Sequence, residues 1–316
     1  ITEIINDHIS KGKKYIIFDN AVESFTTKEV QLIYDLLDDI DLPASNVYYL
    51  TSSLDADIIH DLYCETNEIS SKINVTILRT FETSSKQNLK ASVPDTEYNI
   101  GKREKNYLCM NRLPHLHRIG LLGMLYHRNL LENSYYSYYD STHSLMDDTL
   151  QYVSQLLPDH IESIVQAMYD IKEQLPLKLT LDDEFSNPNG IYDKDVPLFD
   201  NSYFSVIPET YFFKDIFLNE DNSIFFSEKT FNAINMKHPF IMLNRPKSLE
   251  YLRKLGYKTF GPYIDETYDT IEDDQDRLAA IVNEIERLNN FTDDEWLHWQ
   301  RNIKEIVEYN YDVLQN

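Results

Sequence analysis

Three polar clusters follow predicted strands of this sequence, and their residue types suit an anionic ligand. They occupy residues 111–118, 208–210 and 227–230. In open α/β sheets, ligands bind in the crevice outside the carboxyl ends of the strands. We therefore expect the three clusters to contribute to one site, with Glu209 as the candidate ligand contact of the second cluster.

The cluster at residues 227–230 lies where a short extended segment turns into a helix. A helix N-terminus presents free N–H groups and a positive potential, which suit a phosphate. We expect Lys229 to add a full charge, Glu228 to accept hydrogen bonds from two ribose hydroxyls, and Ser227 and Thr230 to complete the cluster. The alternative is structural, with Ser227 capping the helix and Glu228 complementing its dipole.

The cluster at residues 111–118 combines an amide, two arginines and two histidines on a turn into a helix. Arginine suits bidentate contact with a diphosphate, so Arg112 and Arg118 are candidate phosphate ligands and Asn111 a further ligand contact. The alternative is a solvated basic turn paired with the chain's many carboxylates. The spacing of His115 and His117 hints at a metal, but no third ligand stands at a recognisable spacing, so we expect no metal site.

Two carboxylates follow the first predicted strand, where a general base of an N-terminal domain would lie. Asp19 and Glu23 are the candidates, and the alternative is that both are ordinary surface carboxylates. A further acidic pair, Asp55 and Asp57, lies at the predicted start of a helix, and we interpret it as helix capping.

The elements that must position these residues alternate between strands and helices. Short apolar runs predict strands at 15–18, 46–51, 73–78, 107–110, 135–139, 203–207 and 239–243. Helical spacing, with capping boxes at Thr26 and Thr292, predicts helices at 30–40, 56–67, 119–131, 145–175 with a break at Pro158, 228–237, 247–255 and 292–314. This alternation is typical of parallel sheets covered by helices. The polar stretch 83–105 predicts a linker between two domains, residues 1–100 and 106–291.

Composition excludes several classes of function. The 316 residues include 29 Lys and Arg against 53 Asp and Glu, a net charge of −24, which opposes general binding to nucleic acid or to anionic lipid. Only 7 residues are glycine, and the glycine-based phosphate loop, dinucleotide turn and nucleophile elbow are all absent from the sequence. No apolar run has the length of a membrane span, and the two cysteines suggest neither a disulfide framework nor a zinc motif, so we expect a cytoplasmic protein.

Taken together, the clusters and their flanking elements resemble the α-1,3-fucosyltransferases and a group of viral and phage glycosyltransferases. The similar segments are residues 106–111 followed by Arg118 and a helix, residues 204–210, residues 226–234 followed by 238–241, and residues 252–260 with 264–269. The resemblance covers roughly residues 104–290. It implies that Glu228 binds the ribose of a nucleotide and that Lys229 and Arg118 bind its phosphates.

The resemblance implies a GT-B-like fold, in which two Rossmann-like domains face a cleft and a closing helix at 292–316 packs back toward the N-terminal domain. It implies a glycosyltransferase that moves a sugar from a GDP- or UDP-sugar to a glycan or small-molecule acceptor. Catalysis would be inverting and independent of a metal or other cofactor, with Arg118 and Lys229 stabilising the leaving diphosphate. The alternatives are a phage enzyme that glycosylates DNA bases and a non-catalytic sugar- or nucleotide-binding module.

Overall fold

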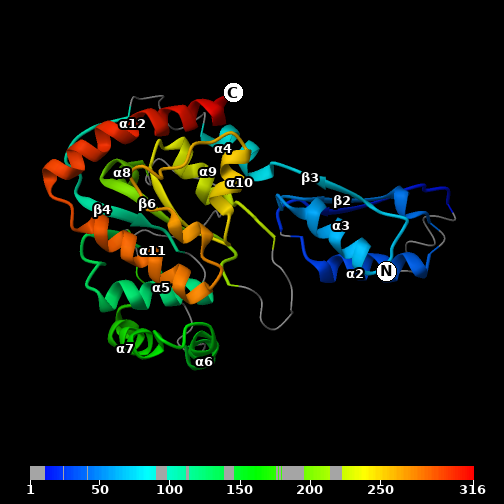
Figure 1. The fold of residues 1–316 in the computed structure, drawn as a ribbon, viewed down its shortest axis with the longest axis horizontal. Coiled ribbons are helices and arrows are strands. Elements are labelled where there is room, and N and C mark those ends of the chain that lie inside the picture. The colour runs from blue at the N-terminus through cyan, green and yellow to red at the C-terminus, as the bar shows by residue number, and fades with distance from the viewer. Residues whose placement is uncertain are drawn as a thin grey trace. The chain divides into compact units, whose positions relative to one another are not determined.

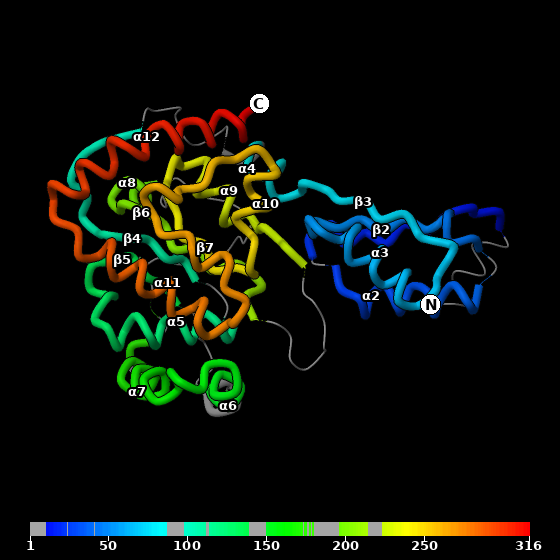
Figure 2. The backbone as a smooth tube through the Cα atoms, in the orientation of Figure 1, coloured from blue at the N-terminus to red at the C-terminus, as the bar shows by residue number. Residues whose placement is uncertain are grey.

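The computed structural model describes residues 11–23, 25–40, 42–89, 98–111, 114–138, 146–175, 177, 179, 196–213 and 223–316. The chain is a mixed α/β protein with two parallel sheets. It divides into two units: unit 1 comprises Ile1–Thr83 and Lys214–Phe226, and unit 2 comprises Ser84–Phe213 and Ser227–Asn316. Each unit contains one of the sheets, as Figures 1 and 2 show.

Unit 1 is a three-stranded parallel sheet with the order β1-β2-β3. Its elements are β1 (Ile16–Asn20), α2 (Thr27–Asp38), β2 (Val47–Thr51), α3 (Ala56–Thr66) and β3 (Asn74–Ile77). Both crossovers run in the same direction along the sheet, so right-handed connections place α2 and α3 on the same face. The core lies between that face and the two helices, and Phe25, Val30 and Tyr49 are buried in it.

A second stretch of chain completes unit 1. Ile224 accepts a hydrogen bond from Leu54 N at 2.8 Å, and its own N–H donates to Asp55 Oδ1 at 2.8 Å. Phe225 packs edge-on against Phe81. Asp55 is the residue that precedes α3, but its side chain makes no capping bond to the helix. The interpretation of Asp55 as a cap is therefore wrong, because its carboxylate binds this distant segment instead.

Unit 2 is built on a four-stranded parallel sheet with the order β5-β4-β6-β7. Its strands are β4 (Lys105–Cys109), β5 (Ser134–Tyr136), β6 (Ser202–Pro208) and β7 (Phe240–Leu243). Every residue of β6 is buried, as expected for a central parallel strand covered on both faces, and every residue of β7, the last strand in this order, is buried too.

The helices of unit 2 lie on both sides of this sheet, and those at Met146–Leu156 and Ile161–Ile171 pack on the helix Leu116–His127. They are α4 (Thr80–Leu89), which enters from unit 1, α5 (Leu116–His127), α6 (Met146–Leu156), α7 (Ile161–Ile171), α8 (Val196–Asp200), α9 (Glu228–Asn235), α10 (Ser248–Lys254), α11 (Asp274–Asn289) and α12 (Asp293–Gln315). From β4 the chain crosses through α5 to β5, at one end of the strand order. From β6 it crosses through α9 to β7, at the other end. Right-handed connections then place α5 and α9 on opposite faces, as Figure 1 shows.

The last helix packs within unit 2. Trp296, near its start, stacks on Tyr203 of β6 with ring centroids 4.1 Å apart. At its end, Gln315 Nε2 donates to Asn235 Oδ1 of α9 at 2.7 Å. These contacts fix the helix to β6 and α9 of its own unit. The expected packing of residues 292–316 toward the N-terminal domain stays a prediction.

The domain boundary also differs from the expected one. Unit 1 ends at Thr83 in its first stretch, not near residue 100, and α4 replaces the first part of the expected linker at 83–105. This helix was missed because its sequence is polar and lacks apolar spacing. Both capping boxes and the helix break at Pro158 are confirmed. Among the described helices, none is both long and apolar enough to cross a membrane.

Candidate functional site

The sheet of unit 2 has a topological switch point between β4 and β6. These two strands are neighbours, and the chain leaves them in opposite directions, through α5 to β5 and through α9 to β7. Such a point opens a crevice outside the carboxyl ends of the strands, where ligands bind in doubly wound folds. Asn111 and Glu209 follow the two strands at this point. In unit 1, the order of the three described strands contains no such reversal.

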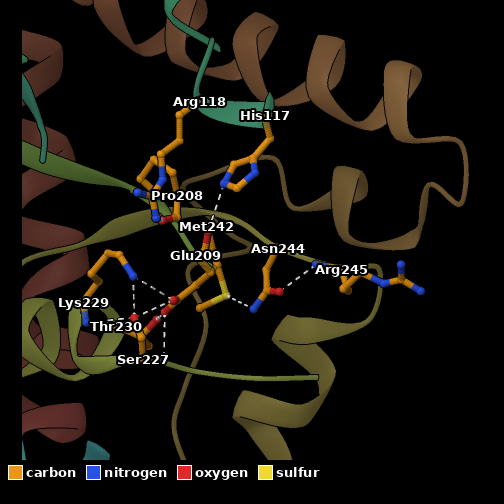
Figure 3. Close-up of polar contacts among 10 residues, drawn as sticks. All are labelled: His117, Arg118, Pro208, Glu209, Ser227, Lys229, Thr230, Met242, Asn244 and Arg245. Atoms are coloured by element: carbon orange, nitrogen blue, oxygen red, sulfur yellow. Dashed lines mark hydrogen bonds and ion pairs between the residues drawn. The ribbon is translucent and has the colours of Figure 1, made fainter. Parts of the chain in front are cut away.

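Glu209 is the centre of a polar network, shown in Figure 3. Its carboxylate is fully buried. Oε1 accepts from Thr230 Oγ1 at 2.6 Å and from Ser227 N at 3.2 Å, and Oε2 accepts from Ser227 Oγ at 2.6 Å. Lys229 Nζ lies 3.3 Å from Oε2 and donates to Ser227 Oγ at 2.6 Å. The carboxylate thus has four donors, all from the first turn of α9 or its cap.

The N-terminus of α9 binds a carboxylate of the chain itself. Ser227 caps the helix through Lys229 N, as expected. The anion beside that cap is the chain's own Glu209, because Ser227 N donates to its carboxylate. Glu209, Ser227 and Thr230 therefore hold α9 against the end of β6. Of the four expected contacts at residues 227–230, only Lys229 and Glu228 keep partial exposure toward solvent.

The first turn of α5 bonds to the end of β6 across the switch point. His117 is buried and its Nε2 donates to the carbonyl oxygen of Glu209 at 2.9 Å. Arg118 is also buried, and its Nη2 donates to the carbonyl oxygen of Pro208 at 3.2 Å. Burial, the nearby Arg118 charge and other groups hold the pKa of His117 well below its usual value, so this ring is neutral. His117 consequently joins α5 to β6 without adding charge.

His115 precedes α5 and stacks on His117 with ring centroids 5.7 Å apart. Burial and the charges of Arg118 and Lys229 lower the pKa of His115 to about 4. Lys229 is thus close enough to affect both histidines electrostatically. The structure therefore brings together the first and third clusters, with Arg118 and Lys229 as the cations of one neighbourhood.

Glu228 is the second carboxylate of this neighbourhood. Burial raises its pKa, the Glu209 charge raises it further, and Lys229 and Arg118 oppose that effect. The charge of Glu228 in turn acts on the guanidinium of Arg118, whose pKa is lowered chiefly by burial. The two cations and two carboxylates balance one another, so the site is close to neutral overall.

Asn111 lies at the other side of the switch point and is almost completely buried, with 1% of its surface exposed. Its N–H donates to Ser137 Oγ at 3.0 Å, and its side-chain Nδ2 donates to the sulfur of Cys109 at 3.3 Å. Within the described part of the chain, its Oδ1 has no hydrogen-bond partner. A buried amide oxygen without a donor is costly, which makes Asn111 the clearest open acceptor at the switch point.

The remaining expected site residues lie elsewhere. Arg112 falls outside the described residues. Asp19 and Glu23 belong to unit 1, at and just beyond the end of β1. Asp19 Oδ1 accepts from Ala21 N at 3.2 Å, and the carbonyl oxygen of Glu23 accepts from Thr51 Oγ1 at 3.2 Å. Their role as a general base stays a prediction.

Sequence reasoning did not assign roles to His117 and Arg245. His117 lies in the first cluster, but only the fold reveals that it bonds to Glu209. Arg245 follows β7, at the same carboxyl edge of the sheet, and no sequence pattern around it indicated a site. Over the ranges that the structure describes, no group of three or more His, Cys, Asp or Glu side chains is arranged to hold a metal ion.

Comparison with protein-family models, with curated proteins and with solved structures found no match to this chain.

Proposed function

We propose that this protein is a glycosyltransferase of the GT-B type that uses a nucleotide sugar as its donor. In this proposal unit 2 binds the donor at its switch point, and unit 1 supplies the acceptor site. The protein would work without a metal or other cofactor, in a cytoplasmic setting, on a glycan or small-molecule acceptor. The support is the chemistry of the residues around the switch point.

The observation that carries the proposal is that the charges of Arg118 and Lys229 both act on the half-buried Glu228. Two cations next to the crevice of a doubly wound sheet suit a diphosphate. Burial raises the pKa of the Glu228 carboxylate, so hydrogen-bond donors brought by a ligand would stabilise its charged form. The two hydroxyls of a ribose offer two such donors. A nucleoside diphosphate satisfies both requirements at once.

The mechanism follows from where charge develops. When the bond between sugar and diphosphate breaks, negative charge grows on the leaving phosphate. Lys229 and Arg118 would stabilise that charge, and Glu209 would hold Lys229 in place through its 3.3 Å ion pair. The acceptor hydroxyl needs a base, for which Asp19 and Glu23 of unit 1 remain the candidates.

A binding panel tests the proposal. UDP, GDP, CDP and their sugars are titrated into the full chain while thermal unfolding is followed. A ligand present at a hundred times its dissociation constant should stabilise the protein by about 2.7 kcal/mol. Lys229→Met should lower the affinity for whichever nucleotide binds by about tenfold or more, since a charge-assisted contact is lost.

The matched control is Lys254→Met, because Lys254 is an exposed lysine that pairs with Glu250 at 2.9 Å on α10. It should leave nucleotide binding unchanged. Absence of binding by every nucleotide in the panel would contradict the proposal. A protein that binds a nucleotide sugar, but neither transfers the sugar to any of a range of acceptors nor hydrolyses the donor, would instead be a non-catalytic module. We expect no nucleic-acid partner, since the net charge is −24.

A further inference from the structure

Arg245 is a buried arginine that has no counter-ion within the part of the chain that the structure describes. It follows β7, and 8% of its surface is exposed. Its backbone N–H donates to Asn244 Oδ1 at 2.8 Å, and its carbonyl oxygen accepts from Ser248 Oγ at 2.6 Å. Its Nη1 is buried and has no hydrogen-bond partner among the described residues. None of the described carboxylates forms an ion pair with its guanidinium.

A neighbouring arginine of the same unit has an ion pair and several hydrogen bonds, although its Nε has no partner among the described residues. Arg277 of α11 is 1% exposed, donates to the carbonyl oxygens of Ile271 and Phe212 at 3.0 and 2.8 Å, and pairs with Asp274. Its guanidinium also lies 4.4 Å from the ring centroid of Phe212. The Arg245 charge adds to the lowering of the pKa of Arg277, so the two cations are near each other.

Asp274 forms an ion pair with Arg277, and the charge of Glu272 also acts on it, but no described carboxylate forms an ion pair with Arg245. A buried charge is expensive unless it is paired, and an unsatisfied buried donor adds to that cost. Arg277 has an ion pair with Asp274, whereas Arg245 has none with a described carboxylate and its buried Nη1 has no described hydrogen-bond partner. The fold therefore retains at Arg245 a group that weakens it.

We propose that Arg245 binds an oxyanion, a phosphate or a carboxylate, at a second anion subsite on the carboxyl edge of the unit 2 sheet. Guanidinium donors match the geometry of both anions and can bind them through two parallel hydrogen bonds. In Figure 3 the Arg245 side chain points away from Glu209 and Lys229. The subsite is therefore distinct from the Lys229 neighbourhood, and it does not depend on the proposed transferase activity.

The test measures anion binding by the full chain. Inorganic pyrophosphate and malonate, at matched ionic strength, are titrated calorimetrically into the Lys229→Met variant and into the double variant that also carries Arg245→Gln. The two anions distinguish phosphate from carboxylate as the ligand chemistry. We expect Arg245→Gln to lower the affinity for whichever anion binds by at least about tenfold, because one charge-assisted contact is lost. Arg253→Gln, in the same background, is the control, because Arg253 is half exposed and lies 3.6 Å from Glu266.

Thermal unfolding without added anion separates this role from a structural one. If Arg245 awaits a ligand, Arg245→Gln should keep or raise the melting temperature, because it removes an unpaired buried charge. If Arg245 is structural, the variant should melt several degrees lower. Arg245→Lys, which keeps the charge but loses the guanidinium fork, should also bind the anion more weakly and provides a second variant should the glutamine variant not fold.

A melting temperature lowered in Arg245→Gln, together with anion affinity within about twofold of its parent, would overturn the subsite. That result would leave the transferase proposal intact if nucleotides still bind through Lys229. Conversely, loss of anion binding in Arg245→Gln supports the subsite even where no nucleotide sugar binds the protein.

Discussion

The ammonium of Lys229 and the carboxylate of Glu209 form an ion pair of 3.3 Å in which the carboxylate is fully buried and the lysine side chain is 21% exposed. One partner therefore faces the core and the other reaches solvent. The buried partner binds the cap of α9, so the position of the exposed cation is fixed by the fold. The two residues should respond differently to substitution.

Glu209→Gln should strongly destabilise unit 2. It removes the only charge that Lys229 pairs with among the described carboxylates, and it points an amide N–H₂ at hydroxyl and backbone donors. We expect a loss of about 3 kcal/mol in the free energy of unfolding, the scale for breaking a buried pair. Urea denaturation measures it. Glu286→Gln, which removes a half-exposed partner of Arg128 at 2.8 Å, should cost under about 1 kcal/mol. Equal losses in both variants would refute the network's structural role.

Lys229→Met should lower the free energy of unfolding by about 1–2 kcal/mol, since Glu209 keeps three other donors. A lysine at a helix start opposes the helix dipole, so sequence reasoning alone expects its removal to be neutral or stabilising. The ion pair with Glu209 reverses that sign. A variant that melts at or above the wild-type temperature would show that the pair contributes nothing.

Glu228→Gln should stabilise the protein at neutral pH. The folded pKa of Glu228 is raised, chiefly by burial, so ionising it costs stability at every pH above that folded pKa. Below the unfolded pKa the carboxyl is protonated in both states, and the gain from the substitution should vanish. Unfolding at pH 7 and at pH 4 measures the difference. If Glu228 binds ribose, the same variant should raise KM for the donor and leave kcat nearly unchanged.

His238→Gln should flatten the acid side of the stability profile. His238 is buried between Ser205 Oγ at 2.7 Å and the carbonyl oxygen of Ser202 at 2.8 Å, and burial lowers its pKa to about 3. Between the unfolded pKa near 6.5 and this value the unfolded state binds one more proton, so stability falls as pH falls. The wild type should lose about 1.4 kcal/mol per pH unit more than the variant between pH 6 and 4. If wild type and variant lose stability equally as the pH falls, the proton is taken up by a group other than His238.

Gly123→Ala should be far more damaging than Gly120→Ala, although both lie on α5. A Cβ at Gly123 would meet the Ile164 backbone at 2.8 Å, whereas a Cβ at Gly120 would meet the flexible end of Leu157 at 2.5 Å. Alanine gains about 1 kcal/mol of helix propensity at either position. We expect a net loss of about 2 kcal/mol at Gly123 and a change near zero at Gly120. Comparable losses in thermal unfolding would indicate that α5 and α7 can move apart.

Local patterns in the sequence were sufficient for most elements of the fold. The capping boxes at Thr26 and Thr292 satisfy helix N-termini within three residues, so they can be read directly. Helix α11 was missed, although Leu278, Ile281 and Ile285 have helical spacing and are buried. Its many charged residues obscured that spacing.

The site was less accessible from the sequence because its contacts are long-range. Ser227 and Thr230 were correctly placed beside a helix start, but their hydroxyls bind Glu209, some twenty residues earlier. Spacing cannot reveal which carboxylate fills a helix N-terminus. The same holds for Arg245, since only the fold shows that a charged residue after a strand is buried and lacks a partner.

The return of the chain to unit 1 at Ile224 has a consequence for biosynthesis. Leu54 N and the Asp55 carboxylate each bond to Ile224, which follows the end of the first stretch of unit 1 at Thr83 by roughly 140 residues. At about 5–20 residues per second, a ribosome needs roughly 10–30 s to supply that segment. Unit 1 therefore has its three strands but lacks this segment while the first three strands of the other sheet emerge. In a nascent chain stalled before residue 223, unit 1 should be cut by protease or bound by chaperone more readily than in a chain stalled after the segment has emerged.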